Sequence, residues 1–268
     1  MDAFKMICTI DVRVLQDLDA ISHEAAAVFT AASRDCIALK GSFAIALSGG
    51  STPRRFYTLL SSDSYINKIN WRCVHFFWAD ERCVSKEHED SNFRSAFKAF
   101  LSRVPLPAGN IHRIKGEKEP GDAAIEYEDE IRGFFGKMAL PVFDFIILGV
   151  GEDGHTASLF PDSRALKETD RLAVSVSTDE GNRVTLTLPV LNNANQILFL
   201  AAGSSKAEVL YEILEGENRK AYPAGLVKPV RGKITWLIDR RAAGRLKKVN
   251  LGVNNFLRNE KNRKIANG

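Results

Sequence analysis

The sequence predicts an α/β protein whose mostly parallel sheet is covered by helices on both faces. Short, continuous apolar runs, typical of buried parallel strands, recur along the chain. Segments with apolar residues every three or four positions, typical of amphipathic helices, lie between these runs. This alternation is the pattern of a parallel sheet. The 268 residues contain no internal repeat or low-complexity linker, so we expect one domain over residues 1–245, followed by a basic tail at 246–268.

The expected strands are short and mostly apolar. They are residues 5–14, 43–47, 74–78, 111–114, 143–148, 172–176, 184–188, 197–201 and 235–238. A polar turn at 178–182 separates two of them that alternate between apolar and polar residues, which is the pattern of a half-buried strand.

The expected helices lie between these strands. The first is long and amphipathic, covers 15–39 and ends at Gly41. The others are a helix from Arg54, a helix that residues 90–92 cap and that runs to about Leu101, residues 122–135, residues 207–214, and a helix that starts after Asp239.

The sequence SGGSTP at 48–53 joins an expected strand to an expected helix. Thr52 is a natural N-cap and Pro53 suits the first helical position, so we expect the helix to begin at Arg54. Free N–H groups and the helix dipole at such a terminus favour a phosphate, although the spacing of a Walker loop is absent. An ordinary capped turn is the alternative. The candidate phosphate-binding residues are Gly49, Gly50, Ser51 and Thr52.

A second glycine-rich loop, GVGEDGHTASLFP at 149–161, follows the expected strand 143–148. It places two acids and His155 at the carboxyl end of a strand, where open α/β sheets bind ligands. A histidine of ordinary pKa near 6.5 can take a proton from water at neutral pH. Either Asp153 or Glu152 could orient the ring or stabilise its protonated form.

Two other polar segments also follow expected strands. Asp80, Glu81 and Arg82 come directly after 74–78, and they line the same crevice or form a surface salt-bridge cluster. Gly203 to Lys206 makes a second junction of strand, glycine, hydroxyls and helix, with Lys206 as an additional cation for an anionic ligand.

Other chemistries have weaker support. Asp153 and His155 could be two metal ligands, with His75 or Asp80 completing the set, but a third ligand at standard spacing is missing. Ser158 could form a serine–histidine pair, but the GxSxG motif is absent. We therefore expect no metal, no other cofactor and no covalent nucleophile.

Composition narrows the class of protein. The net charge of +4 is mild, and the basic tail lacks the aromatic interleaving of nucleic-acid-binding arms, so we expect no nucleic-acid partner. No apolar run reaches the roughly 18 residues of a membrane span, and no secretory signal is present. The four cysteines have no CxxC spacing. These features predict a cytoplasmic protein.

Several segments occur in the order found in one known family. They are SGGSTP at 48–53, FFWADERCV at 76–84, DSNF at 90–93, FDFIILGVGEDGHTASLFP at 143–161, RVTLTLPVLNNA at 183–194 and GSSKAE at 203–208. Over residues 10–245 the chain resembles the 6-phosphogluconolactonases, in a superfamily that also contains glucosamine-6-phosphate isomerase/deaminase.

The resemblance implies a Rossmann-like three-layer α/β/α fold and hydrolysis of 6-phospho-D-glucono-1,5-lactone to 6-phosphogluconate without a required metal. This is the second step of the oxidative pentose phosphate pathway. By the family pattern His155 activates water, with Asp153 and Arg82 close to it. The positions that match the family's phosphate-binding residues are Ser51, Thr52, Arg183 and Lys206. The expected partner is a phosphorylated sugar lactone, bound by a monomer or small homo-oligomer.

The chain departs from the family pattern at two places. Residues 177–182 lack the prolines common in relatives, which affects the placement of Arg183, and Asp162 replaces a usual glycine. Two alternative functions stay open. An isomerase/deaminase would need an additional carboxylate soon after His155, but 156–161 contains no acid. A sugar-phosphate sensor would bind the same ligand and release it unchanged.

Overall fold

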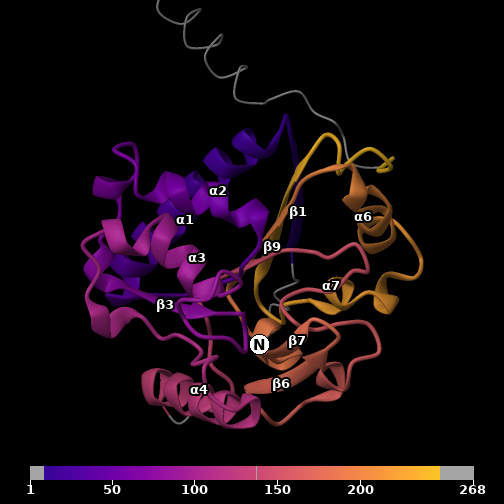
Figure 1. Ribbon diagram of the computed structural model, residues 1–268. Coiled ribbons are helices and arrows are strands. Elements are labelled where there is room, and N and C mark those ends of the chain that lie inside the picture. The colour runs from indigo at the N-terminus through magenta and orange to yellow at the C-terminus, as the bar shows by residue number, and fades with distance from the viewer. Residues whose placement is uncertain (1–8, 137, 248–268) are drawn as a thin grey trace, which may run out of the picture.

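The computed structural model describes residues 9–136 and 138–247, and a six-stranded sheet forms its centre (Figure 1). The strand order is β1-β9-β8-β5-β2-β3, and every neighbouring pair is parallel. The strands are β1 (Thr9–Leu15), β2 (Phe43–Leu47), β3 (Val74–Trp78), β5 (Phe145–Leu148), β8 (Gln196–Ala201) and β9 (Lys233–Asp239). The predicted parallel sheet is therefore confirmed.

Helices cover both faces of this sheet, which confirms the three-layer α/β/α architecture. In Figure 1, α1, α2 and α3 lie on one side of β1 and β9, and α6 and α7 lie on the other. The helices are α1 (Leu18–Lys40), α2 (Ser51–Leu60), α3 (Asn92–Ala99), α4 (Pro120–Phe135), α5 (Leu188–Leu191), α6 (Ala207–Leu214) and α7 (Pro223–Leu226). Short 3₁₀ turns cover Ile66–Lys68, Trp71–Cys73, Leu101–Arg103, Ala108–Asn110, Arg164–Lys167, Ser204–Lys206 and Arg219–Ala221.

The helix ends follow the capping chemistry of the sequence. The Asp17 side chain accepts a hydrogen bond from the backbone N–H of Ala20 and caps α1, and Gly41 ends that helix in the left-handed conformation with φ of 82°. The Ser91 hydroxyl accepts from the N–H of Arg94 and caps α3. The two side-chain caps fix where α1 and α3 begin, and Gly41 fixes where the chain leaves α1 for β2.

A second, three-stranded sheet was not expected. Strand β4 (Asp80–Arg82) pairs antiparallel with β7 (Gly181–Leu186), and β7 pairs antiparallel with β6 (Ala173–Thr178). Ala79 joins the two sheets, because its N–H donates to the carbonyl of Leu47 and its carbonyl accepts from the N–H of Leu186. Helix α4 packs against β6 and β7, as Figure 1 shows.

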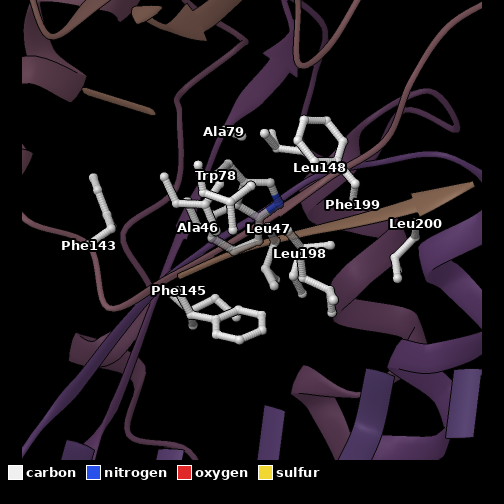
Figure 2. Packing of buried hydrophobic residues seen from close by; sticks show 14 of the residues in the cluster. Ala46, Leu47, Trp78, Ala79, Phe143, Phe145, Leu148, Leu198, Phe199 and Leu200 are labelled. Carbon is white, nitrogen blue, oxygen red and sulfur yellow. The ribbon is translucent and has the colours of Figure 1, made fainter. Parts of the chain in front are cut away.

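The core lies between the central sheet and its helices. Strands β2 and β5 are buried along their whole length, and Phe29 of α1 contacts the rings of Phe43 and Phe145 edge-on. Figure 2 shows part of this core, with Leu47 beside its register partner Trp78. Burying each such large apolar side chain contributes about 1.5–3 kcal/mol to folding. The sheet is therefore a rigid base for the loops at its carboxyl edge.

Three expected elements are wrong in the structure. Helix α2 begins at Ser51 rather than Arg54, because Gly50, with φ of 101°, turns the chain earlier and Thr52 lies inside the helix. Residues 111–114 do not form a strand, and only Ile111 bridges to Phe76. Turns rather than a helix follow Asp239 within the described residues.

Two further expectations fall partly on residues that are not described. The first expected strand begins at residue 5, but the description starts at residue 9. Most of the basic tail, 248–268, also lies outside the described residues. Among the helices that are described, none has the length and apolar character needed to cross a membrane.

Candidate active site

One pocket opens at the carboxyl edge of the central sheet. Its walls come from the turn after β2, the loop after β5, the short strand β4 and the end of β8. All expected site residues except Asp153 line it. They are Gly49, Gly50, Ser51, Thr52, Arg82, His155, Arg183 and Lys206. The structure therefore brings together groups that are up to 157 positions apart in the sequence, from Gly49 to Lys206.

His155 and Asp153 form a hydrogen-bonded pair beside this pocket. The Asp153 Oδ1 atom lies 2.6 Å from Nδ1 of His155 and 3.1 Å from its backbone nitrogen. The imidazole also packs on the ring of Phe160, at 4.7 Å between centroids. Because the carboxylate engages Nδ1, the other ring nitrogen, Nε2, is the one available to a water molecule or a ligand. Glu152 was the other acid considered as a partner of His155, but its Oε1 lies 4.0 Å from Nζ of Lys206.

Two glycines of the loop make room for this pair. A Cβ atom on Gly151 would lie 2.1 Å from Nδ1 of His155 and 2.5 Å from Oδ1 of Asp153. Gly154 has φ of 81°, and a Cβ there would meet the ring of Tyr222. The spacing of glycines around His155 is thus a steric requirement of the loop.

The first turn of α2 faces the same pocket. Gly50 precedes the helix, and no side chain of residues 9–136 or 138–247 forms a capping hydrogen bond at its N-terminus. The free N–H groups of this turn, with the Ser51 and Thr52 hydroxyls, suit an anion. Lys206 adds a cation from the second glycine junction, but the N–H of Gly203 there donates to the carboxylate of Asp239. That junction therefore contributes a side chain to the pocket and not a second helix terminus.

Arg82 is held through one of its terminal nitrogens. Its NH1 donates to the carbonyl of Asp90 at 2.7 Å and to Oδ1 of Asn92 at 2.8 Å. Its Nε is buried and has no hydrogen-bond partner among the described residues. A buried donor without a partner is unfavourable, so this nitrogen is suited to an oxygen of a bound ligand or water.

Arg183 lies directly beside Arg82, because the two are register partners in the β4–β7 pair. The guanidinium of Arg183 packs over the Phe160 ring at 5.5 Å, and its NH2 lies 2.5 Å from Oε2 of Glu180. The hairpin of β6 and β7 therefore brings Arg183 into the pocket despite the unusual sequence before it.

Comparison with known proteins identifies the family to which the chain belongs. Residues 16–236 match the family model described as glucosamine-6-phosphate isomerases/6-phosphogluconolactonase. The chain belongs to this family.

The similarity to individual members of the family extends over most of the chain. A 6-phosphogluconolactonase of Synechocystis sp. is 40% identical over 240 residues, which cover 88% of this chain and 98% of that protein. The crystal structure of a devB protein is 36% identical with a TM-score of 0.82, covering 89% of this chain and 100% of that one. A 6-phosphogluconolactonase structure from Thermotoga maritima is 30% identical with a TM-score of 0.76, covering 86% and 100%.

Asn92 also lines the pocket, although its local sequence predicted no role in a site. Asn92 is 3% exposed, and its Nδ2 donates to the carbonyl of Asp80 while its Oδ1 accepts from Arg82. A Cβ on Gly49 would lie 1.8 Å from that Oδ1. Asn92 thus connects the glycine turn, β4 and Arg82. The DSNF motif was the available signal, but local pattern indicated only a helix cap.

The acids of β4 are buried, so the surface salt-bridge cluster was a wrong alternative. Glu81 accepts hydrogen bonds from the backbone N–H groups of Arg82, Asn92 and Phe93 and from the Ser91 hydroxyl. Burial outweighs these donors and raises the pKa of Glu81 to about 7. Asp80 lines the pocket, and its Oδ2 accepts a hydrogen bond from Ser158 in the loop that contains His155.

Ser158 and the metal ligands considered above have other surroundings. The Ser158 hydroxyl is fully buried and donates to Oδ2 of Asp80 at 2.7 Å, so it does not pair with His155. His75 lines a different pocket, and its Nδ1 lies 3.1 Å from Nε2 of His112. Among the described residues, no three His, Cys, Asp or Glu side chains are grouped so that they could hold a metal ion.

Proposed function

We propose that the protein is a 6-phosphogluconolactonase, which hydrolyses 6-phospho-D-glucono-1,5-lactone to 6-phospho-D-gluconate in the oxidative pentose phosphate pathway. One observation carries this proposal: the His155–Asp153 pair borders a pocket that also contains Arg82, Arg183 and Lys206. A base beside several cations suits a neutral ester function attached to a phosphate. The relatives named 6-phosphogluconolactonase, similar over most of the chain, support the same activity.

The hydrolysis begins with water held by His155. The imidazole Nε2 takes a proton while the oxygen of that water bonds to the lactone carbonyl carbon. Asp153, on Nδ1, keeps the ring oriented and stabilises the imidazolium that forms. The bond between the carbonyl carbon and the ring oxygen then breaks, and the ring oxygen takes the proton from the imidazolium. The products are a free hydroxyl group and a carboxylic acid, which releases its remaining proton to solvent at neutral pH.

Arg82 stabilises the negative charge that develops on the carbonyl oxygen. Its Nε is buried and has no partner among the described residues, so a hydrogen bond to this oxygen would satisfy that donor. Because Asp90 and Asn92 hold NH1, the guanidinium need not reorganise during the reaction. Removing one such donor typically lowers kcat by about 10²–10³-fold.

The phosphate binds at the part of the pocket formed by α2, Arg183 and Lys206, called the phosphate wall below. The first turn of α2 presents free N–H groups and the Ser51 and Thr52 hydroxyls, and Arg183 and Lys206 add positive charge. Anchoring the phosphate at this wall positions the lactone ring over His155. We include in the proposal a cytoplasmic monomer or small homo-oligomer without cofactor or nucleic acid, in which Cys36, Cys73 and Cys83 are free thiols.

Acid production from freshly generated lactone tests the proposal, because the lactone also opens spontaneously. The purified protein should raise the rate well above the spontaneous rate. A matched assay with glucosamine 6-phosphate should release no ammonia, whereas ammonia release would favour the isomerase/deaminase alternative. Recovery of bound lactone without any acceleration would identify a sensor and overturn the proposed activity.

A further inference from the structure

The Arg183 guanidinium occupies an unfavourable electrostatic position beside a second arginine. The residue is 9% exposed, it packs against Phe160, and its register partner across the sheet is another arginine, Arg82. Like charges placed directly opposite each other in a sheet are destabilising. A largely buried cation in this position requires an anion nearby.

Glu180 supplies that anion. Its Oε2 lies 2.5 Å from NH2 of Arg183, and it is the only acid that forms an ion pair with Arg183 within residues 9–136 and 138–247. Lys206, the other cation of the phosphate wall, has a looser contact of 4.0 Å with Glu152. The Arg183–Glu180 pair is therefore the tighter of the two contacts between these cations and nearby acids.

The carboxylate can leave this contact at little cost. The Glu180 side chain is 80% exposed, in the turn that connects β6 to β7 just before Gly181. Ion pairs with an exposed partner contribute only about 0.2–1 kcal/mol, because water and salt compete with them. A phosphate group, with more charge and three acceptor oxygens, pairs with a guanidinium more strongly than one carboxylate does.

We infer that Glu180 is an internal competitor of the ligand phosphate for Arg183. Its charge neutralises the guanidinium while the pocket is empty, and it lowers the affinity of the pocket for anions. A phosphate that binds must displace this carboxylate or tolerate its charge. The inference rests on the proposed function, in which Arg183 holds the phosphate.

Titration calorimetry with inorganic phosphate tests the inference without turnover. Glu180→Gln keeps an acceptor oxygen for Arg183 but removes the charge, so any positioning by Glu180 is preserved while competition is relieved. Phosphate should bind Glu180→Gln about two- to fivefold more tightly than the wild type, as expected for removing an exposed ion pair. The control Asp179→Asn removes the neighbouring exposed charge and should change the affinity less.

A second variant, Arg183→Met, locates the effect. It should weaken phosphate binding, and Glu180→Gln added to it should have no further effect. If Arg183→Met weakens binding but Glu180→Gln leaves the affinity unchanged or lower, the competition is refuted and the phosphate wall stands. If Arg183→Met binds phosphate like the wild type, the placement of the phosphate is wrong and the inference falls with it. The acid-production assay then decides separately whether the lactonase activity holds.

Discussion

Arg82 and Arg183 are register partners across β4 and β7, so two guanidinium-bearing side chains lie side by side at the edge of the pocket. Register partners in an antiparallel pair have Cβ atoms about 4.5–5.5 Å apart. Arg183 has a carboxylate partner, whereas the hydrogen bonds of Arg82 go to neutral oxygens. Glu180 offsets part of the repulsion in the structure, and in the proposed function the phosphate of the ligand would add further negative charge.

Replacing the proposed base should abolish most of the activity. His155→Ala removes the group that takes the proton from water, so kcat should fall on the order of 10²-fold or more. Initial rates of acid production, corrected for spontaneous opening, measure this loss. His23→Ala, which removes an exposed histidine of α1, serves as the control and should keep full activity. Near-normal turnover by His155→Ala would contradict the assigned role.

Adding one methyl group beside the His155–Asp153 pair should also lower kcat. Gly151→Ala puts a Cβ 2.1 Å from Nδ1 of His155, so the His155–Asp153 pair must move. We expect kcat to fall by roughly 10²-fold, as for other displacements of about 1 Å in active sites. Gly149→Ala, in the same loop, meets no protein atom within 4 Å and should lose much less. Equal losses in the two variants would indicate bulk in the pocket rather than a displaced pair.

Asn92 should act through Arg82. Asn92→Ala releases NH1 of Arg82 from Oδ1, and we expect kcat to fall roughly tenfold with a smaller change in KM. In an Arg82→Ala background the same substitution should have little further effect on kcat, which a double-mutant cycle measures. Ser91→Ala is the control: it removes the cap of α3 and should cost about 1 kcal/mol of stability while sparing kcat. Additive losses from Asn92→Ala and Arg82→Ala would rule out this coupling.

Lys206 should affect binding more than chemistry. Lys206→Ala removes a point charge from the phosphate wall, so KM should rise several-fold while kcat changes little. The effect should shrink as salt is added, because screening weakens the interaction that the variant has lost. Lys228→Ala, an exposed lysine outside the pocket lining, should leave KM unchanged. A fall in kcat at constant KM would show that Lys206 acts on the reacting atoms instead.

Glu81 should make stability depend on pH. Burial raises its folded-state pKa to about 7, above the ordinary value of 4.5, so the unfolded chain releases the proton first as pH rises. This group's contribution to the free energy of unfolding is therefore largest below pH 4.5 and is lost as pH rises to about 7. Between pH 5 and 7.5 the wild type should lose about 2 kcal/mol more than Glu81→Gln. Urea denaturation at both pH values measures the difference, and parallel curves for the two proteins would contradict it.

The central sheet could be predicted from sequence because its strands are continuous apolar runs. Strands β2 and β3 have the expected bounds, 43–47 and 74–78. Strand β4 could not be predicted, because Asp80–Arg82 has no apolar alternation and its partner, β7, is about 100 residues away. The start of α2 was misplaced because Thr52 and Pro53 resemble a cap, whereas the positive φ of Gly50 sets the boundary.

Like the fold, the candidate site could be predicted from the sequence only in part. The glycine-rich loops marked the base and the phosphate wall, and the structure places their residues around one pocket; the roles of those residues stay predictions. The contacts of Asn92 depend on tertiary structure, since its side chain reaches Asp80 and Arg82 from the start of α3. The contact between Glu180 and Arg183 could not be predicted either. Two residues three positions apart on a hairpin can form an ion pair, but the sequence does not show that the arginine is buried.

The β4–β7 pairing fixes the position of Arg82 relative to Arg183, whereas Glu180 lies in a turn outside this pairing. Slipping this pairing by one residue would turn one of the two arginines to the opposite side of the sheet. Asp179 and Glu180, in the turn between Thr178 and Gly181, lie outside this pairing. A substitution at Glu180 therefore leaves the register of the two arginines intact, and on the inference above it would change the affinity of the pocket for anions.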